Sequence, residues 1–191
     1  MSAKRIALVI VAGFAFGAVD QYLGSRVMLG DHFAFGLWAS TVSAMSAPWL
    51  LLPFLVGCGE ARGGRAAVLG LTVTMAALSG YFTLMWSPVE GVALLRSLPH
   101  LGILLASQRA NIVGGLLTGP LFGYLGQRWR TGRSWAAAAL LAGAFCLEPL
   151  ARWLAGQLSP PLIVWAAEAA AGCLTMLCLA GVALTRRRSL G

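Results

Sequence analysis

Long apolar runs recur along the chain, and short segments between them carry most of the charged residues. This pattern predicts helices over residues 5–24, 33–57, 66–86, 110–126, 134–154 and 162–184. Each run is close to the roughly 20 apolar residues that an α-helix needs to cross the hydrocarbon core of a bilayer. The sequence therefore predicts an all-α fold, a polytopic membrane bundle of six transmembrane helices.

The segment 91–108 is ambiguous between a helix on the membrane surface and part of a span. It is apolar, but it contains Arg96, Pro99 and His100, which make it too interrupted to cross the membrane. Two alternatives remain open: either the segment forms an interfacial helix, or its second half extends the helix predicted over 110–126 backwards.

The composition supports a membrane protein. Of the 191 residues, 59% are hydrophobic and 10% are charged, and the mean hydropathy is +0.80, whereas soluble domains carry about 25% charged residues. These values exclude a water-soluble globular enzyme and a disordered chain. The length leaves room for a single transmembrane domain over 1–191, with the lipid bilayer as its main partner.

The positive charge predicts an orientation in the membrane and not a nucleic-acid partner. Six spans place ten of the 14 basic residues on one side, in four groups: Lys4 and Arg5; Arg62 and Arg65; Arg128, Arg130 and Arg133; Arg186, Arg187 and Arg188. Because cytoplasmic loops carry the excess of Lys and Arg, we expect both termini to be cytoplasmic. Abundant Ala and Gly with a single lysine suggest a GC-rich bacterial genome. We therefore expect a multi-pass protein of the bacterial cytoplasmic (inner) membrane.

Glycines at four-residue spacing predict faces where helix backbones approach closely. Gly13 and Gly17 share a face of the first helix, and Gly115, Gly119 and Gly123 share a face of the fourth. In lipid, small residues at this spacing allow close helix packing. The faces contact either helices of the same chain or a partner, which would be another membrane subunit or a second copy.

Polar residues at membrane depth are the strongest functional signal, because a charge at the bilayer centre costs about 2.5 to 3.5 kcal/mol on insertion scales. Asp20, Glu148 and Glu168 come from three helices, and the helical rise places them at a similar level, roughly 9 Å below the outer surface. We predict that they help to form an outward-facing polar pocket. The candidate solute-binding residues are Asp20, Gln108, Arg109, Asn111, Glu148, Arg152 and Glu168.

Glu148 and Arg152 lie at i and i+4, so their side chains share one face of a helix. One interpretation is a structural ion pair that packs helix 134–154 against helix 162–184. The other is a site for a small polar or cationic solute, which Glu148 and Glu168 contact and in which Arg152 and Arg109 neutralise the acids or hold an anionic group. Proton coupling through one of the carboxyl groups is a further possibility.

No motif predicts an enzyme, a metal site or a cofactor. The four cysteines form no C-x-x-C pair, and no H-E-x-x-H, G-x-S-x-G or phosphate-binding loop is present. Glu148 and Arg152 reproduce only the E-x-x-x-R part of the motif of prenyl-protein-type intramembrane proteases, and no predicted span carries a histidine. Two alternatives to solute binding remain: a non-transporting accessory subunit, and an unrecognised membrane enzyme with Ser87 or Ser107 as nucleophile.

Four stretches resemble an uncharacterised family of small actinobacterial membrane proteins. They are Ser46-Ala47-Pro48-Trp49, Trp86-Ser87-Pro88, Gly119-Pro120-Leu121-Phe122-Gly123 and Glu148-Pro149-Leu150-Ala151-Arg152. The resemblance covers most of the chain. It implies a membrane fold but no particular activity.

The predicted architecture is also similar to that of the substrate-binding S components of energy-coupling-factor vitamin transporters. That resemblance implies six helices, cytoplasmic termini, an outward-facing site and small residues in the first helix that contact a coupling subunit. Ala3 and Ala7 reproduce an A-x-x-x-A spacing, and Gly13 and Gly17 reproduce a looser version of it.

Overall fold

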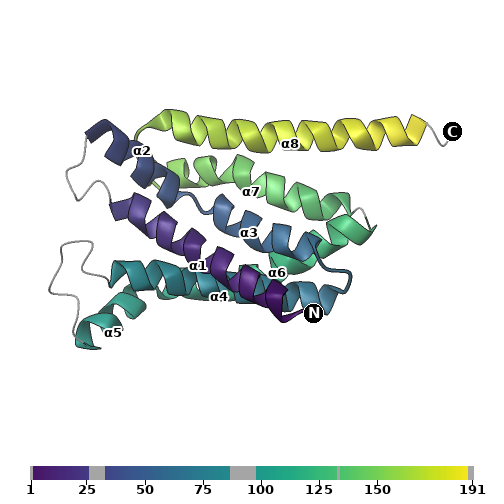
Figure 1. The fold of residues 1–191 in the computed structure, drawn as a ribbon. Coiled ribbons are helices and arrows are strands. Elements are labelled where there is room, and N and C mark those ends of the chain that lie inside the picture. The colour runs from purple at the N-terminus through teal and green to yellow at the C-terminus, as the bar shows by residue number, and fades with distance from the viewer. Residues whose placement is uncertain (1, 26–32, 87–97, 133, 189–191) are drawn as a thin grey trace.

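The protein is all-α over the residues described by its structure, a computed structural model. These are residues 2–25, 33–86, 98–132 and 134–188, and they form helices without any strand. The helices are α1 (Ala3–Ser25), α2 (Phe33–Ala44), α3 (Ala47–Cys58), α4 (Gly63–Met85), α5 (Leu98–Ser107), α6 (Arg109–Gly132), α7 (Trp135–Leu154) and α8 (Leu162–Arg188). The long helices run side by side, and the N- and C-termini lie at the same end (Figure 1).

Several of these helices are suited to cross a membrane. Among the described residues, α1, α4 and α7 are long and apolar enough to do so individually, and α2 with α3 passes the same test as a bent pair. The apolar part of α8, Leu162–Cys178, is shorter. The molecule is therefore compatible with a membrane protein that has three to four such spans by length and composition.

The structure differs from the predicted continuous helix over 33–57. The chain bends by 56° between Ala44 and Ala47, so that two helices replace one. Pro48 lies in the first turn of α3, and because proline has no N–H it cannot donate to the carbonyl of Ala44, as residue 48 of an unbroken helix would. The break deprives polar backbone groups in the middle of the predicted span of their partners within the helix.

The structure also answers part of the question whether segment 91–108 is a separate helix or an extension of the helix that follows it. Residues 91–97 lie outside the described residues, and α5 covers Leu98–Ser107 as a helix of its own. A turn at Gln108 separates α5 from α6, which begins at Arg109. The second half of the segment is therefore a short separate helix that contacts α6 lightly, and α6 is not simply extended backwards.

The first glycine face packs within the chain. Gly13 and Gly17 lie against α4, where a Cβ atom at Gly17 would overlap the backbone of Ala77 and one at Gly13 would crowd Val73. Val9, Leu69 and Val73 form the buried apolar cluster beside this contact. The intrachain alternative therefore holds for these two glycines, and their close packing makes α1 and α4 the most extensive helix pair in the molecule.

The second glycine face also packs within the chain, again on α4. Gly115 and Gly119 lie against Thr74, and Gly123 lies against the backbone of Ala66. α6 also packs closely on α3 from its other side. Together α1, α3, α4 and α6 form a tight four-helix core, in which α6 buries its glycine face and leaves Leu117 and Leu121 exposed on the other side.

The remaining long helices form a hairpin beside this core. α7 and α8 pack extensively against each other, and a Cβ atom at Gly172 of α8 would crowd Cys146 of α7. Their contacts with the core are sparse: α7 touches α6 and α3, and α8 touches α2. The α7–α8 hairpin is therefore a separate layer, which is seen beside the core in Figure 1.

The glycine packing makes a direct prediction. We expect Gly17→Ala to lower the free energy of unfolding by about 1 to 3 kcal/mol, because the added methyl group must push α1 away from the α4 backbone. The measurement is the denaturation midpoint of the purified protein in detergent. Gly143→Ala in α7 is the matched control, since a Cβ atom there meets nothing within 4 Å. Equal midpoints for the two variants would contradict the close packing.

Candidate functional site

A cavity of about 1030 Å³ lies between the helix core and the α7–α8 hairpin. Six helices contribute to its wall, with Asp20 from α1, Ser43 from α2, Trp49 from α3, Tyr81 from α4, Asn111 from α6 and Glu148 from α7. Its volume is at the upper end of the range typical of small-molecule sites, about 300 to 1,000 Å³. The cavity exists because α7 packs sparsely against α6 and α3.

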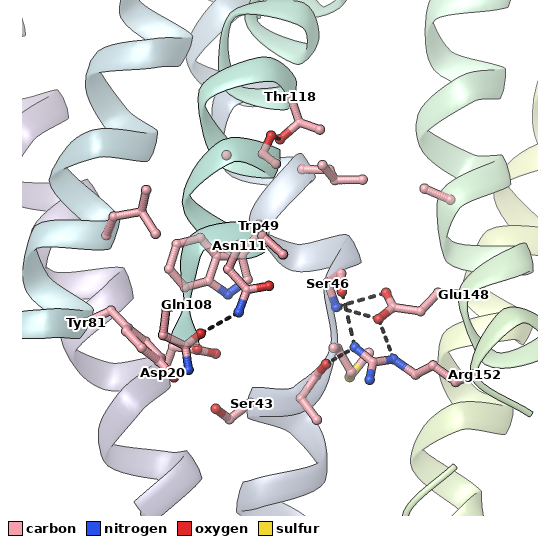
Figure 2. A pocket seen from close by; sticks show the side chains of 18 of the residues that line it. Asp20, Ser43, Ser46, Trp49, Tyr81, Gln108, Asn111, Thr118, Glu148 and Arg152 are labelled. Atoms are coloured by element: carbon pink, nitrogen blue, oxygen red, sulfur yellow. Dashed lines mark hydrogen bonds and ion pairs between the residues drawn. The ribbon is translucent and has the colours of Figure 1, made fainter. Parts of the chain in front are cut away.

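The structure brings five of the seven predicted site residues to this cavity. They are Asp20, Gln108, Asn111, Glu148 and Arg152. Arg109 is exposed at the first position of α6 and does not line the cavity, and Glu168 is buried in α8 outside the wall. Figure 2 shows the labelled residues in two groups, with Asp20, Tyr81 and Trp49 on one side and Glu148 and Arg152 on the other.

Glu148 caps the first turn of α3. Its carboxylate accepts hydrogen bonds from the backbone N–H of Ser46, at 2.7 and 2.9 Å to its two oxygens, and from that of Ala47 at 2.8 Å. A helix N-terminus carries unpaired N–H groups and a partial positive charge, which a carboxylate satisfies. Glu148 thus provides from α7 the acceptor that an unbroken helix would have provided from its own backbone.

Arg152 completes the same junction on the side of α2. Its Nε donates to Glu148 Oε1 at 2.8 Å. Its Nη2 donates to the carbonyl oxygen of Ala44, the last residue of α2, and to Ser46 Oγ at 3.2 Å. The guanidinium also lies 5.1 Å from the ring centroid of Trp165 in α8. One ion pair therefore serves both ends of the broken helix and attaches the α7–α8 hairpin to it.

These contacts change the interpretation of the Glu148–Arg152 pair. The structural alternative placed the pair between helix 134–154 and helix 162–184. The structure shows Arg152 against Trp165 of α8, but most hydrogen bonds of the pair go to the α2–α3 junction. Three donors already occupy the oxygens of Glu148, namely the N–H of Ser46, which both oxygens share, the N–H of Ala47 and Nε of Arg152, so about one of the four acceptor positions of the carboxylate is left.

Asp20 is the acidic group on the opposite wall. It is half-buried near the end of α1, and the side chains of Trp49 and Ser43 are placed to donate hydrogen bonds to it. Among the described residues it has no basic partner. Asn111 and Gln108 lie in the same group of residues and are joined by a hydrogen bond of 2.6 Å. Asp20 is therefore the charged group of the cavity that is best placed to receive a solute.

Aromatic residues surround this side of the cavity, and sequence reasoning did not include them in the site. Trp49 makes edge contacts with Phe16 and Tyr81, at centroid distances of 5.3 and 6.1 Å, and Tyr81 makes one with Phe82 at 5.5 Å. Trp49, Tyr81 and Phe82 line the cavity. The signal that could have found Tyr81 and Phe82 is their position about one helical turn from the predicted outer end at residue 86; Trp49, in the middle of the predicted helix 33–57, carried no such signal.

Glu168 has a different environment from the other two acids. The residue is 3% exposed, and neither carboxyl oxygen has a hydrogen-bond donor among the described residues. The charged groups that act on it are Glu148 and Arg152. Glu168 is therefore buried and is not among the residues that line the cavity.

Comparison of the chain with protein-family models, with curated proteins and with solved structures found no significant match. Function is therefore inferred from the geometry of the molecule itself.

The junction at Ser46 yields a second prediction. We expect Glu148→Gln to lower the free energy of unfolding by about 2 to 4 kcal/mol, because it removes a charge-assisted cap and leaves Arg152 without its counter-ion. Hydrogen–deuterium exchange of residues 44–50 should rise in the same variant. Leu147→Ala is a suitable control, since Leu147 lies on the same helix with 61% of its surface exposed. Unchanged exchange at residues 44–50 would show that Glu148 does not hold the junction.

Proposed function

We propose that this protein is a six-span membrane protein that binds a small cationic solute in the cavity between its helix core and the α7–α8 hairpin. The observation that carries the proposal is Asp20, an acidic side chain without a basic partner among the described residues, beside the aromatic side chains of Trp49 and Tyr81. Carboxylates and aromatic faces both attract cations, and the attraction is stronger where water is excluded.

The charge of the cavity wall favours a cation over an anion. Asp20, Glu148 and Arg152 are its acidic and basic residues, and when all three are ionised the wall carries one net negative charge. Because Glu148 and Arg152 compensate each other at 2.8 Å, the excess charge lies at Asp20. The rest of the lining is largely apolar or aromatic, which suits a solute with an ammonium group and an apolar body.

The proposed fifth and sixth spans, α6 and α8, are supported by their lengths. α6 and α8 contain 24 and 27 residues, which corresponds to about 36 and 40 Å of helix and is enough to cross a bilayer. With α2 and α3 as one broken span, six spans would place both termini on one side, and the common end of the two termini in Figure 1 supports this count. The basic residues at that end favour the cytoplasm.

The alternative from a different class is an accessory membrane subunit that does not transport. The commitment of Glu148 and Arg152 to the α2–α3 junction favours this alternative for the ion pair. It does not account for Asp20, which is not part of that junction. Variants of Asp20 therefore separate the two functions better than variants of the pair.

We expect the purified protein in lipid nanodiscs to bind benzyltrimethylammonium in preference to phenylacetate, which carries a similar ring with a negative charge. Asp20→Asn should weaken binding of the cation about tenfold or more, a loss of about 1.4 kcal/mol for each factor of ten. Isothermal titration calorimetry measures both affinities. Glu60→Gln is the matched control, because Glu60 pairs with Arg5 at 2.8 Å and is not among the cavity-lining residues.

Equal affinity of the wild type and Asp20→Asn for benzyltrimethylammonium would refute a cation site at Asp20. A preference for phenylacetate would refute the charge argument as well. A failure to bind either probe, with native mass spectrometry showing a protein subunit and no small molecule after gentle purification, would favour the accessory subunit.

The topology has its own test. We expect a fluorescent protein fused after Gly191 to be bright in cells, because it matures in the cytoplasm. Alkaline phosphatase inserted at Gly156, in the α7–α8 connection, should be active, because that enzyme needs the extracytoplasmic side. The reverse pattern would invert the proposed orientation, and activity of both reporters at both positions would contradict a fixed topology.

A further inference from the structure

Glu168 is a buried acid that neither the cavity nor the α2–α3 junction uses. It lies in α8, with 3% of its surface exposed and with both carboxyl oxygens lacking a hydrogen-bond donor among the described residues. An ionised carboxylate at such a position would lose its hydration and gain almost no hydrogen bonds in return, which is unfavourable. The group therefore requires either a bound ion or a different protonation state.

The residues around Glu168 favour a protonated carboxylic acid over a bound ion. Glu148 is close enough to share a hydrogen bond with it, and Arg152 is the basic group that acts on it. α2, which α8 also touches, contains no ionisable side chain. Within the described part of the chain no group of three or more His, Cys, Asp or Glu residues could hold a metal ion. Two carboxylates offer only acceptors, so a hydrogen bond between them needs one proton.

We propose that Glu168 and Glu148 form a proton-binding site between α7 and α8, in which a carboxylic acid at Glu168 donates a hydrogen bond to the Glu148 carboxylate. Protonated, Glu168 gains a partner for its buried hydroxyl group and carries no charge. Glu148 lines the cavity on its other side, and so it is the group through which the proton can reach water in the cavity.

Loss of this proton would disturb the α2–α3 junction. When Glu168–COOH releases H⁺ and becomes a carboxylate, two negative charges face the single guanidinium of Arg152. That guanidinium holds the Ala44 carbonyl and Ser46 Oγ, and the new charge pulls it towards α8. Glu148, which caps Ser46 and Ala47, is repelled at the same time. The proton site therefore controls how firmly the hairpin holds the broken helix.

The experiment uses the full chain in nanodiscs and has two readouts. Infrared difference spectroscopy across a rise in pH should show loss of the carbonyl band of a protonated carboxylic acid, and Glu168→Gln should remove that band. Hydrogen–deuterium exchange, corrected for the intrinsic pH dependence with α4 as internal reference, should show protection of residues 44–50 falling about tenfold as the band disappears, the scale of one lost hydrogen bond to a charged group.

Glu168→Gln keeps a donor for Glu148 and cannot ionise, so protection of residues 44–50 should become independent of pH. Glu60→Gln, in the salt bridge with Arg5, should leave the band and its titration unchanged. A wild-type spectrum without an acid band assignable to Glu168, or protection that follows pH equally in wild type and Glu168→Gln, would overturn the proposal. If Glu168→Gln does not fold, Glu168→Asp must shift the band, and an unshifted band would overturn it. None of these outcomes depends on binding of a solute, so the proposals of a proton site and of a solute site can be refuted independently.

Discussion

Backbone polar groups released by a break in a helix need new partners, and this requirement organises the molecule around the break between α2 and α3. An unbroken helix pairs its N–H and C=O groups internally, whereas a broken one leaves those at its new ends without intrahelical partners. Here Glu148 accepts from the start of α3 and Arg152 donates to the end of α2. Two residues on one turn of α7 thus take over the pairing that Pro48 prevents, and they do so without net charge.

The division of the molecule into a tight core and a loosely attached hairpin follows from side-chain size. α4 packs closely against α1 and against α6 at glycines, where the helix backbones come into contact. The hairpin has few contacts with the core, and the Glu148–Arg152 pair joins it to the α2–α3 junction. Space for a solute therefore opens where the polar junction and not glycine packing sets the separation of helices.

The sequence predicted helix positions well, because apolar length and loop charge are local properties. The broken helix was missed because the hydropathy of 33–57 is continuous through Ser46, and because the stability of the break depends on Glu148, about 100 residues away along the chain. The seven candidate residues were chosen for polarity at a common depth. Depth cannot tell which way a side chain points, so Arg109 and Glu168 were grouped with residues that line the cavity.

The three acids Asp20, Glu148 and Glu168 therefore have separate environments, although the sequence presents them as a set. Glu148 is committed to backbone N–H groups and to Arg152, and a solute that displaced these partners would have to compensate an entire helix end. Asp20 faces open volume beside aromatic rings, where attracting a cation requires no rearrangement of the fold. Glu168 is buried in α8, and its carboxyl oxygens have no hydrogen-bond partner among the described residues. If Glu168 releases a proton as proposed, the added charge beside Glu148 acts on the α2–α3 junction and on the cavity wall together, because Glu148 belongs to both.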